Sequence, residues 1–102
     1  MITVVETPTF KLHADKIWSE DERLDFIEWL VSNPEMGDVI PNADGARKIR
    51  WTIKGTGKRG GVRVIYFNQI NEGFIYLIAI YKKSRQSNIS SKDIRKRLND
   101  EH

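Results

Sequence analysis

The hydrophobic period changes near residue 45, and this change constrains the fold more than any other feature of the sequence. Between Leu24 and Val31, apolar residues recur every three or four positions, which is the spacing of an amphipathic helix. From residue 47 to 54 the period is two, and apolar residues alternate with basic or hydroxyl residues: Ile49, Trp51 and Ile53 against Lys48, Arg50, Thr52 and Lys54. Such alternation is typical of a strand with one buried face. The chain therefore predicts helices first and a sheet afterwards.

Capping signals mark the ends of the first two helices. Pro8 suits the start of a helix that carries Phe10, and Ser19 with Glu22 forms a capping box that starts a second helix. This second helix should end before Pro34, because the residue that precedes a proline is pushed out of the α region.

The remaining segments complete an α+β pattern. Three further strands are predicted, at residues 2–5, 62–68 and 74–81. The last two are apolar on both sides, as central strands are, and residues 71–73 should form the turn between them. A final helix should begin at Ser90, with Ile89 and Ile94 spaced as a hydrophobic staple. The predicted order is β-α-α-β-β-β-α, an α+β fold with a small, mostly antiparallel sheet, two N-terminal helices and a short C-terminal helix.

Length and composition favour a single domain in a reducing compartment. With 102 residues the chain suits one domain, residues 1–102. It has no cysteine, which excludes disulfides, thiolate metal sites and cysteine nucleophiles. The sequence shows neither a secretory pattern at its start nor an apolar run of about 18 residues that could span a membrane. We expect a soluble, cytoplasmic protein that does not bind membranes.

Charge is distributed unevenly along the chain. Residues 1–44 contain three basic and ten acidic residues, a net charge of −7, whereas residues 45–102 contain fourteen basic and four acidic residues, a net charge of +10. A strongly basic half suggests a surface that binds a polyanion, most often nucleic acid, because Lys and Arg opposite phosphates release condensed counterions. The alternative is that these charges only keep the surface solvated.

The basic half contains a glycine-rich stretch, RKIRWTIKGTGKRGGVRVIYF, with seven basic residues and no carboxylate. Gly55-x-Gly57-x-x-Gly60 matches the dinucleotide fingerprint, but a strand follows it instead of the required helix. A kinase glycine loop is excluded because the chain is too short for a second lobe, and a Walker A motif because Arg59 follows Lys58. A hairpin turn explains the glycines best, and it leaves Lys58 and Arg59 at its tip.

Other common chemistries have no support in the sequence. The chain has two histidines, His13 and His102, which provide neither an acid–base pair nor ordinary zinc-ligand spacing. The carboxylates of the N-terminal helices are explained by capping and solvation. No metal ion or other cofactor is expected.

Several of these segments together resemble one protein family. ARKIRW, the GTGKRGG turn, GVRVIYF, FIYLIAIYKKS and a short C-terminal helix follow one another as in the RelE superfamily of bacterial toxins. The block G-K-R-G-G-x-R-x-I-Y most resembles the HigB-like branch. The similarity covers roughly residues 45–98, and the N-terminal helices match only in pattern.

The resemblance implies an endoribonuclease that cuts messenger RNA in the ribosomal A site without a metal and so inhibits translation. The family's basic residues fall on Lys48 and Arg50 of one strand, on Arg63 of the next and on Lys83 after the last; Tyr81 is the nearest substitute for an aromatic residue that several relatives carry. Arg63 is expected to hold the phosphate, and Lys48 or Arg50 to stabilise developing charge or act as a base. Further basic residues are expected to bind RNA: Lys54, Lys58, Arg59, Lys82 and Arg85.

The resemblance also implies a partner and leaves two rival functions open. A toxin of this kind needs a cognate antitoxin, HigA-like or RelB-like, besides the ribosome and messenger RNA. ParE-like members share the fold but inhibit DNA gyrase and typically lack the basic set, which this sequence carries. A non-catalytic RNA-binding module would favour exposed aromatic residues between the basic ones, and the predicted outer face of residues 47–54 has none.

Overall fold

The computed structural model describes residues 2–52, 61–82 and 89–101. Their elements follow in the order β1 (Thr3–Glu6), α1 (Pro8–Ile17), α2 (Glu20–Ser32), β2 (Asp38–Val39), β3 (Arg47–Thr52), β4 (Gly61–Gln69), the 3-10 turn η2 (Ile70–Glu72), β5 (Phe74–Lys82) and α3 (Ser91–Glu101). No helix in these ranges is long and apolar enough to cross a lipid bilayer.

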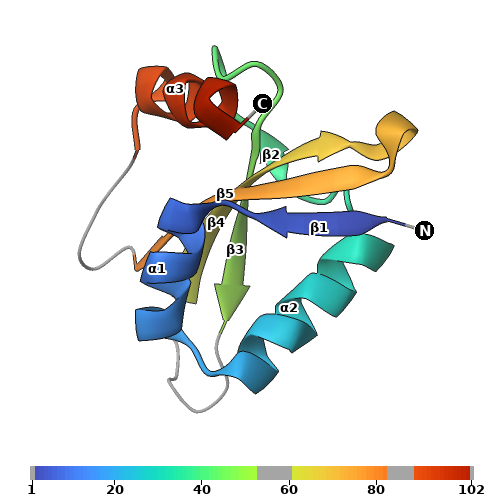
Figure 1. Ribbon diagram of the computed structural model, residues 1–102, viewed down its shortest axis with the longest axis vertical. Helices are drawn as coiled ribbons and strands as arrows, with labels where there is room; N and C mark the ends of the chain where they lie inside the picture. The colour runs from blue at the N-terminus through green and yellow to red at the C-terminus, as the bar shows by residue number, and fades with distance from the viewer. Residues whose placement is uncertain (1, 53–60, 83–88, 102) are drawn as a thin grey trace.

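The strands form one sheet with the order β1-β5-β4-β3-β2. β1 pairs with β5 in parallel, and all other pairs are antiparallel. In Figure 1, α1 and α2 lie on one side of the sheet and α3 lies on the other. This arrangement confirms the predicted α+β class, and the elements follow the predicted order apart from the additional short strand β2.

The structure adds detail that the sequence pattern does not provide. The two-residue strand β2 pairs with Arg47 and Lys48 at the edge of the sheet. The turn between β4 and β5 is a 3-10 turn that ends at Gly73, whose φ of 83° is left-handed and therefore favours glycine. Gly61, which the sequence places in a turn, pairs with Thr52 and belongs to β4.

Local capping fixes the two N-terminal helices. The Thr7 hydroxyl accepts a hydrogen bond from the Phe10 amide and donates one to the carbonyl of Ile78, so it joins α1 to β5. The capping box of α2 is confirmed, because the Ser19 amide donates to the Glu22 carboxylate at 3.0 Å and the Glu22 amide donates to the Ser19 hydroxyl at 3.2 Å.

An aromatic core fills the space between α1, α2 and the sheet. The Phe26 ring lies 5.4 Å from Trp18 and 5.2 Å from Trp51, measured between ring centroids. Phe26 and Leu30 are the buried residues of α2, whereas Leu24 is 49% exposed. The sequence-based prediction that Leu24 belongs to the buried face of this helix is therefore wrong. The larger apolar area of the phenylalanine ring decides which side of α2 faces the sheet.

A second core lies under α3. Ile94 and Leu98 are buried with Ile65 and Ile78, and Ile89 packs against the same cluster. The Ser90 hydroxyl accepts from the Asp93 amide at 3.1 Å, which confirms the cap predicted for this helix. α3 is therefore held against β4 and β5 by its apolar stripe.

A β-bulge in β5 changes which side chains face α3. Ile65 pairs with Ala79 and Tyr66 pairs with Leu77, so Ile78 is an extra residue without a partner on β4. Before the bulge Leu77 faces α1 and α2, and after it the alternation is inverted. As a result Tyr81 lies on the α3 face of the sheet, and the alternation places Lys82 on the opposite face.

Tyr66 makes stability sensitive to high pH. It is fully buried, and its hydroxyl donates to the Pro34 carbonyl at 3.0 Å and accepts from the Gly37 amide at 2.9 Å. Burial is the main cause that raises the pKa of Tyr66. The unfolded phenol ionises at about pH 10, before the folded one, so the free energy of unfolding should fall as pH rises above about 10. In urea unfolding measured between pH 8 and 11, the free energy of unfolding should fall less steeply with pH for Tyr66→Phe than for the wild type. An equally steep fall in both proteins would contradict this.

Candidate active site

Three predicted site residues lie side by side across three strands. Arg50 of β3 is paired with Arg63 of β4, and Arg63 is paired with Tyr81 of β5. Side chains in directly opposite positions of neighbouring strands are close enough to interact. We call these three residues the arginine row.

The arginine row points away from α1 and α2. Trp51, Val62 and Ile80, which are chain neighbours of the row, all pack in the aromatic core beneath those two helices. Successive side chains of a strand point to opposite faces, so the arginine row faces the side that carries α3. Tyr81 joins this face only because of the bulge at Ile78.

The two guanidinium groups reach the same point above the sheet. A Cβ atom on Gly61 would lie 3.5 Å from Nε of Arg50 and 3.6 Å from Nη1 of Arg63. Both distances are ordinary van der Waals contacts, so a Cβ atom would fit here beside the two cations, and both guanidinium groups lie next to Gly61. A guanidinium binds carboxylate or phosphate oxygens through several fixed N–H donors, which makes this point suitable for a phosphate.

These two charges are not neutralised in the described part of the chain. The ion pairs found there join Arg23 to Glu6 at 2.8 Å and to Glu20 at 3.4 Å, on the α2 side of the sheet. Like charges directly opposite each other on neighbouring strands destabilise the sheet. An anion bound between Arg50 and Arg63 removes this repulsion, and the site therefore favours a negatively charged ligand.

No family model matches the sequence. The structure is similar to that of a double mutant of the E. coli toxin RelE in the free state, with a TM-score of 0.62 and 12% sequence identity over 95% of this chain and 96% of that chain. The chain has a RelE-like fold. At 12% identity this likeness shows the fold alone.

The other predicted residues are placed differently. Lys48 lies on the same face as Arg50, two positions before it, and is paired with Ile65. Lys82 is paired with Val62, and the alternation places it on the α1 and α2 face, outside the arginine row. The remaining predicted residues lie outside the described ranges: Lys54, Lys58, Arg59, Lys83 and Arg85.

Tyr81 is a core residue as well as a neighbour of Arg63. It is 5% exposed, and its ring belongs to the buried cluster of Ile94 and Leu98. Its hydroxyl is buried and has no hydrogen-bond partner within the described ranges. Burial raises the pKa of Tyr81, and the Arg63 charge, which lowers it, offsets only part of this effect. The hydroxyl is therefore a protonated donor at neutral pH.

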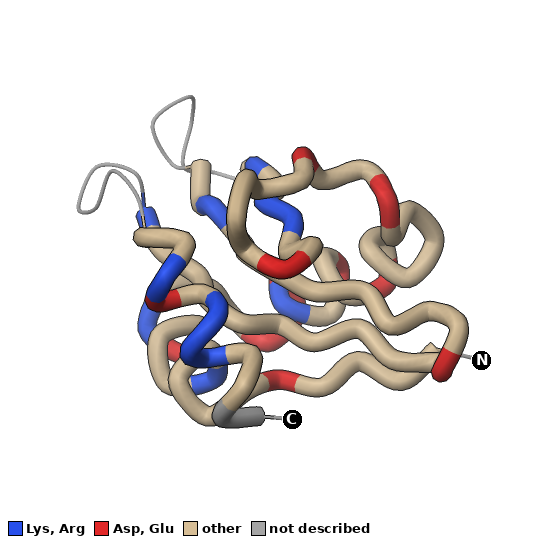
Figure 2. The backbone as a smooth tube through the Cα atoms, turned by 90° about the horizontal axis from the view of Figure 1, so that it is seen from above, with Lys and Arg blue, Asp and Glu red and all other residues tan. Residues whose placement is uncertain are grey.

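None of the site residues predicted from the sequence lies on α3, although the helix carries four basic residues: Lys92, Arg95, Lys96 and Arg97. Figure 2 shows Lys and Arg gathered on α3 and the neighbouring strands, in the half of the view away from the N-terminus. Arg95 also donates to the carbonyl of Asn42. The excess of basic residues in a short amphipathic helix was the signal that could have identified this extension of the basic surface.

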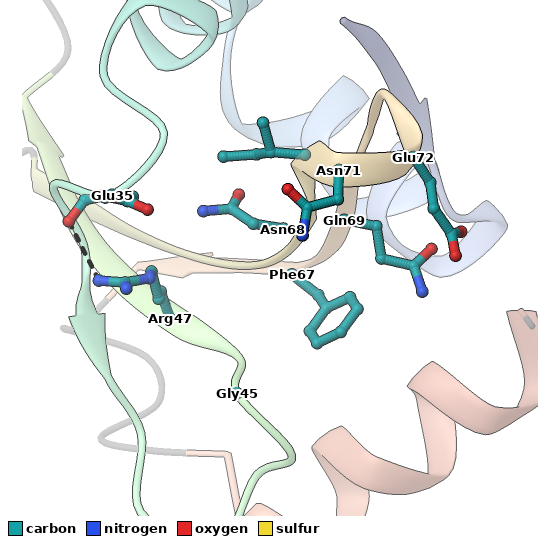
Figure 3. Close-up of a pocket in the computed structure, with 9 residues that line it drawn as sticks. Glu35, Gly45, Arg47, Phe67, Asn68, Gln69, Asn71 and Glu72 are labelled. Carbon is teal, nitrogen blue, oxygen red and sulfur yellow. Dashed lines mark hydrogen bonds between the residues drawn. The ribbon is translucent and has the colours of Figure 1, made fainter.

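A separate hollow of about 440 Å³ lies at the C-terminal end of β4, away from the arginine row. The hollow is lined by three side-chain amides, those of Asn68, Gln69 and Asn71. Arg47 and Glu35 also line it, and Figure 3 shows Arg47 pointing toward Glu35. The Arg47 guanidinium donates to the carbonyls of Glu35 at 3.0 Å and Gly37 at 2.8 Å. Arg47 is therefore used to hold the loop after α2, unlike the arginines of the row.

Within the described ranges, no group of three or more His, Asp or Glu side chains is arranged to hold a metal ion.

Proposed function

We propose that this protein is an endoribonuclease that cuts messenger RNA in the ribosomal A site and serves as the toxin of a type II toxin–antitoxin pair. The observation that carries this proposal is the convergence of Arg50 and Arg63 above Gly61, with no neutralising partner in the described chain. The RelE-like fold supports the same function. The seven basic residues of the β3–β4 segment and the basic helix α3 suit an RNA ligand.

The chemistry follows from what RNA cleavage requires. Attack of a 2′-hydroxyl on the adjacent phosphorus forms a bond to the 2′-oxygen and breaks the bond to the 5′-oxygen. The attacking hydroxyl loses a proton, the pentavalent intermediate gains negative charge, and the leaving oxygen takes a proton. We assign Arg63 to the phosphate and Arg50 to the developing charge, because both reach one point.

Lys48 and Lys83 complete the proposed set. Lys48 lies on the same face as Arg50, and Lys83 is assigned from the resemblance because it follows β5. Tyr81 remains protonated and is buried, which suits a residue that positions Arg63 and does not suit a general base. Lys54, Lys58, Arg59 and Arg85 are proposed to bind the RNA backbone.

The proposed branch is HigB-like, and the proposed partner is a HigA-like or RelB-like antitoxin. An enzyme that cuts messenger RNA harms its own cell unless it is inhibited. The antitoxin either covers the arginine row or binds elsewhere on the toxin and sterically prevents the toxin from entering the ribosome. The proposed location is the cytoplasm, where translation takes place.

Gly61 provides a test of the convergence itself. Gly61→Val should lower the rate of RNA cleavage about tenfold, because its methyl groups occupy the point that the two guanidinium groups share and displace them from the phosphate. Gly61→Ala is the matched control, since its Cβ makes only ordinary contacts, and should stay within about twofold of the wild type. Equal rates for valine and wild type would contradict the assignment.

The product ends test the proposed reaction. Messenger RNA should be incubated with translating ribosomes and the purified protein, and the fragments analysed for their terminal groups. Attack by the 2′-hydroxyl yields a 2′,3′-cyclic phosphate and a 5′-hydroxyl, and a 2′-deoxy nucleotide at the cut position should prevent cleavage there. Fragments with 5′-phosphate ends, or cleavage that persists at the deoxy position, would disprove this reaction.

A further inference from the structure

A second surface with the opposite chemistry lies where the flank of α2 meets β3. A hollow of about 540 Å³ is present there, and it is lined by Asp25, Glu28, Trp29, Ser32, Asn33 and Trp51. We call it the tryptophan hollow. Trp51 and Arg50 are consecutive residues of β3, so the tryptophan hollow and the arginine row lie on opposite faces of the sheet.

Two indole rings form the apolar wall of the tryptophan hollow. The ring centroids of Trp29 and Trp51 are 5.3 Å apart, with an angle of 49° between the ring planes, and both residues are partly exposed. Phe26 packs against both rings, with centroid distances of 6.4 Å to Trp29 and 5.2 Å to Trp51. Asn33 donates to the carbonyl of Trp29 at 2.9 Å. The rings are therefore held in place before any ligand binds.

Two carboxylates complete the tryptophan hollow. Asp25 and Glu28 are exposed, and within the described ranges neither carboxylate forms a hydrogen bond or an ion pair. The faces of indole rings carry negative electrostatic potential, and tryptophan is the best aromatic partner for a cation. The hollow is therefore lined by two indole rings and two negative charges that one ligand could contact together.

We propose that the tryptophan hollow binds an arginine side chain of a protein partner. A guanidinium is planar and can stack on an indole ring while its N–H groups reach a carboxylate, a combination that the compact ammonium of lysine cannot match. The carboxylates and the acidic first half of the chain, with its net charge of −7, repel nucleic acid and attract a basic protein segment. This inference does not depend on the proposed RNA cleavage, because it uses the other face of the sheet.

The test uses the full chain and an arginine peptide as the probe. An acetylated and amidated pentapeptide with one central arginine between glycines is added to ¹⁵N-labelled protein, and the indole N–H signals are followed by NMR. Trp18, which is 6% exposed, provides an internal reference among the three tryptophans. We expect saturable shifts for Trp29 and Trp51 and little change for Trp18. A peptide with citrulline, which has the same shape without the charge, should bind at least about fivefold more weakly.

Charge variants of the protein provide the second arm. The double variant Asp25→Asn/Glu28→Gln should weaken binding of the arginine peptide at least about fivefold, whereas Asp15→Asn, an exposed carboxylate outside the tryptophan hollow, should leave it unchanged. Absence of saturable shifts at Trp29 and Trp51, equal binding of the arginine and citrulline peptides, or equal effects of the two protein variants would each overturn the proposal.

Discussion

Arg63→Ala is expected to lower the single-turnover rate of messenger RNA cleavage about 100-fold or more, which is the usual effect of removing one group that stabilises charge in a transition state. Arg63 lies at the centre of the arginine row, and its guanidinium group lies next to Gly61 together with that of Arg50. The rate should be measured on ribosomes programmed with a defined messenger, with the enzyme in excess. Arg63→Lys, which keeps the charge but loses the planar fork of donors, should recover only part of the rate.

Two controls separate this effect from a loss of folding. Lys16→Ala removes an exposed positive charge from the last turn of α1, on the opposite side of the sheet, and should change the rate by no more than about twofold. Because the Arg63 side chain forms no hydrogen bond or ion pair in the described chain and faces the like charge of Arg50, Arg63→Ala should not lower the thermal midpoint. A rate within a few-fold of the wild type would remove Arg63 from the active site.

Phe26→Ala is expected to have the largest effect on stability. Phe26 is fully buried and its ring contacts Trp18, Trp29 and Trp51, so truncation leaves a cavity that rigid neighbouring rings cannot fill. Phenylalanine to alanine changes in protein cores cost about 3–5 kcal/mol. For a chain of this size that loss should lower the thermal midpoint by more than about 15 °C. Circular dichroism during heating measures it directly.

Leu24→Ala is the matched control for Phe26→Ala. Leu24 is on the same helix, two residues earlier, but is 49% exposed. Its truncation should change the free energy of unfolding by about 0.5 kcal/mol or less. If Leu24→Ala were as destabilising as Phe26→Ala, the buried face of α2 would be the one that the sequence pattern first suggested.

Local signals were sufficient to predict most of the fold. The capping box at Ser19 depends only on residues within one helical turn, and the structure confirms it. The alternation in β3 depends on period two, and Ile49 and Trp51 do pack on one face while Arg50 points to the other. The rotation of α2 was predicted less well, because the choice between Leu24 and Phe26 depends on contacts with the distant Trp51.

The site depends on features that leave little trace in the sequence. The extra residue at Ile78 inverts the alternation of β5, which brings Tyr81 to Arg63 and places Lys82 on the opposite face. A bulge is a property of pairing between two strands, and the sequence of one strand does not specify it. The approach of both guanidinium groups to Gly61 is likewise visible only once Arg50 and Arg63 are placed on neighbouring strands.

The most direct test of the central claim is to add the purified protein to a reconstituted translation reaction and map messenger 5′ ends by primer extension. The account requires new ends at codon-spaced positions that appear only when ribosomes are present and are lost when Arg50 and Arg63 are both replaced by alanine. Intact messenger with continued translation would contradict it. Inhibition of DNA gyrase supercoiling by the same preparation would then assign the RelE-like fold of this chain to a ParE-like function.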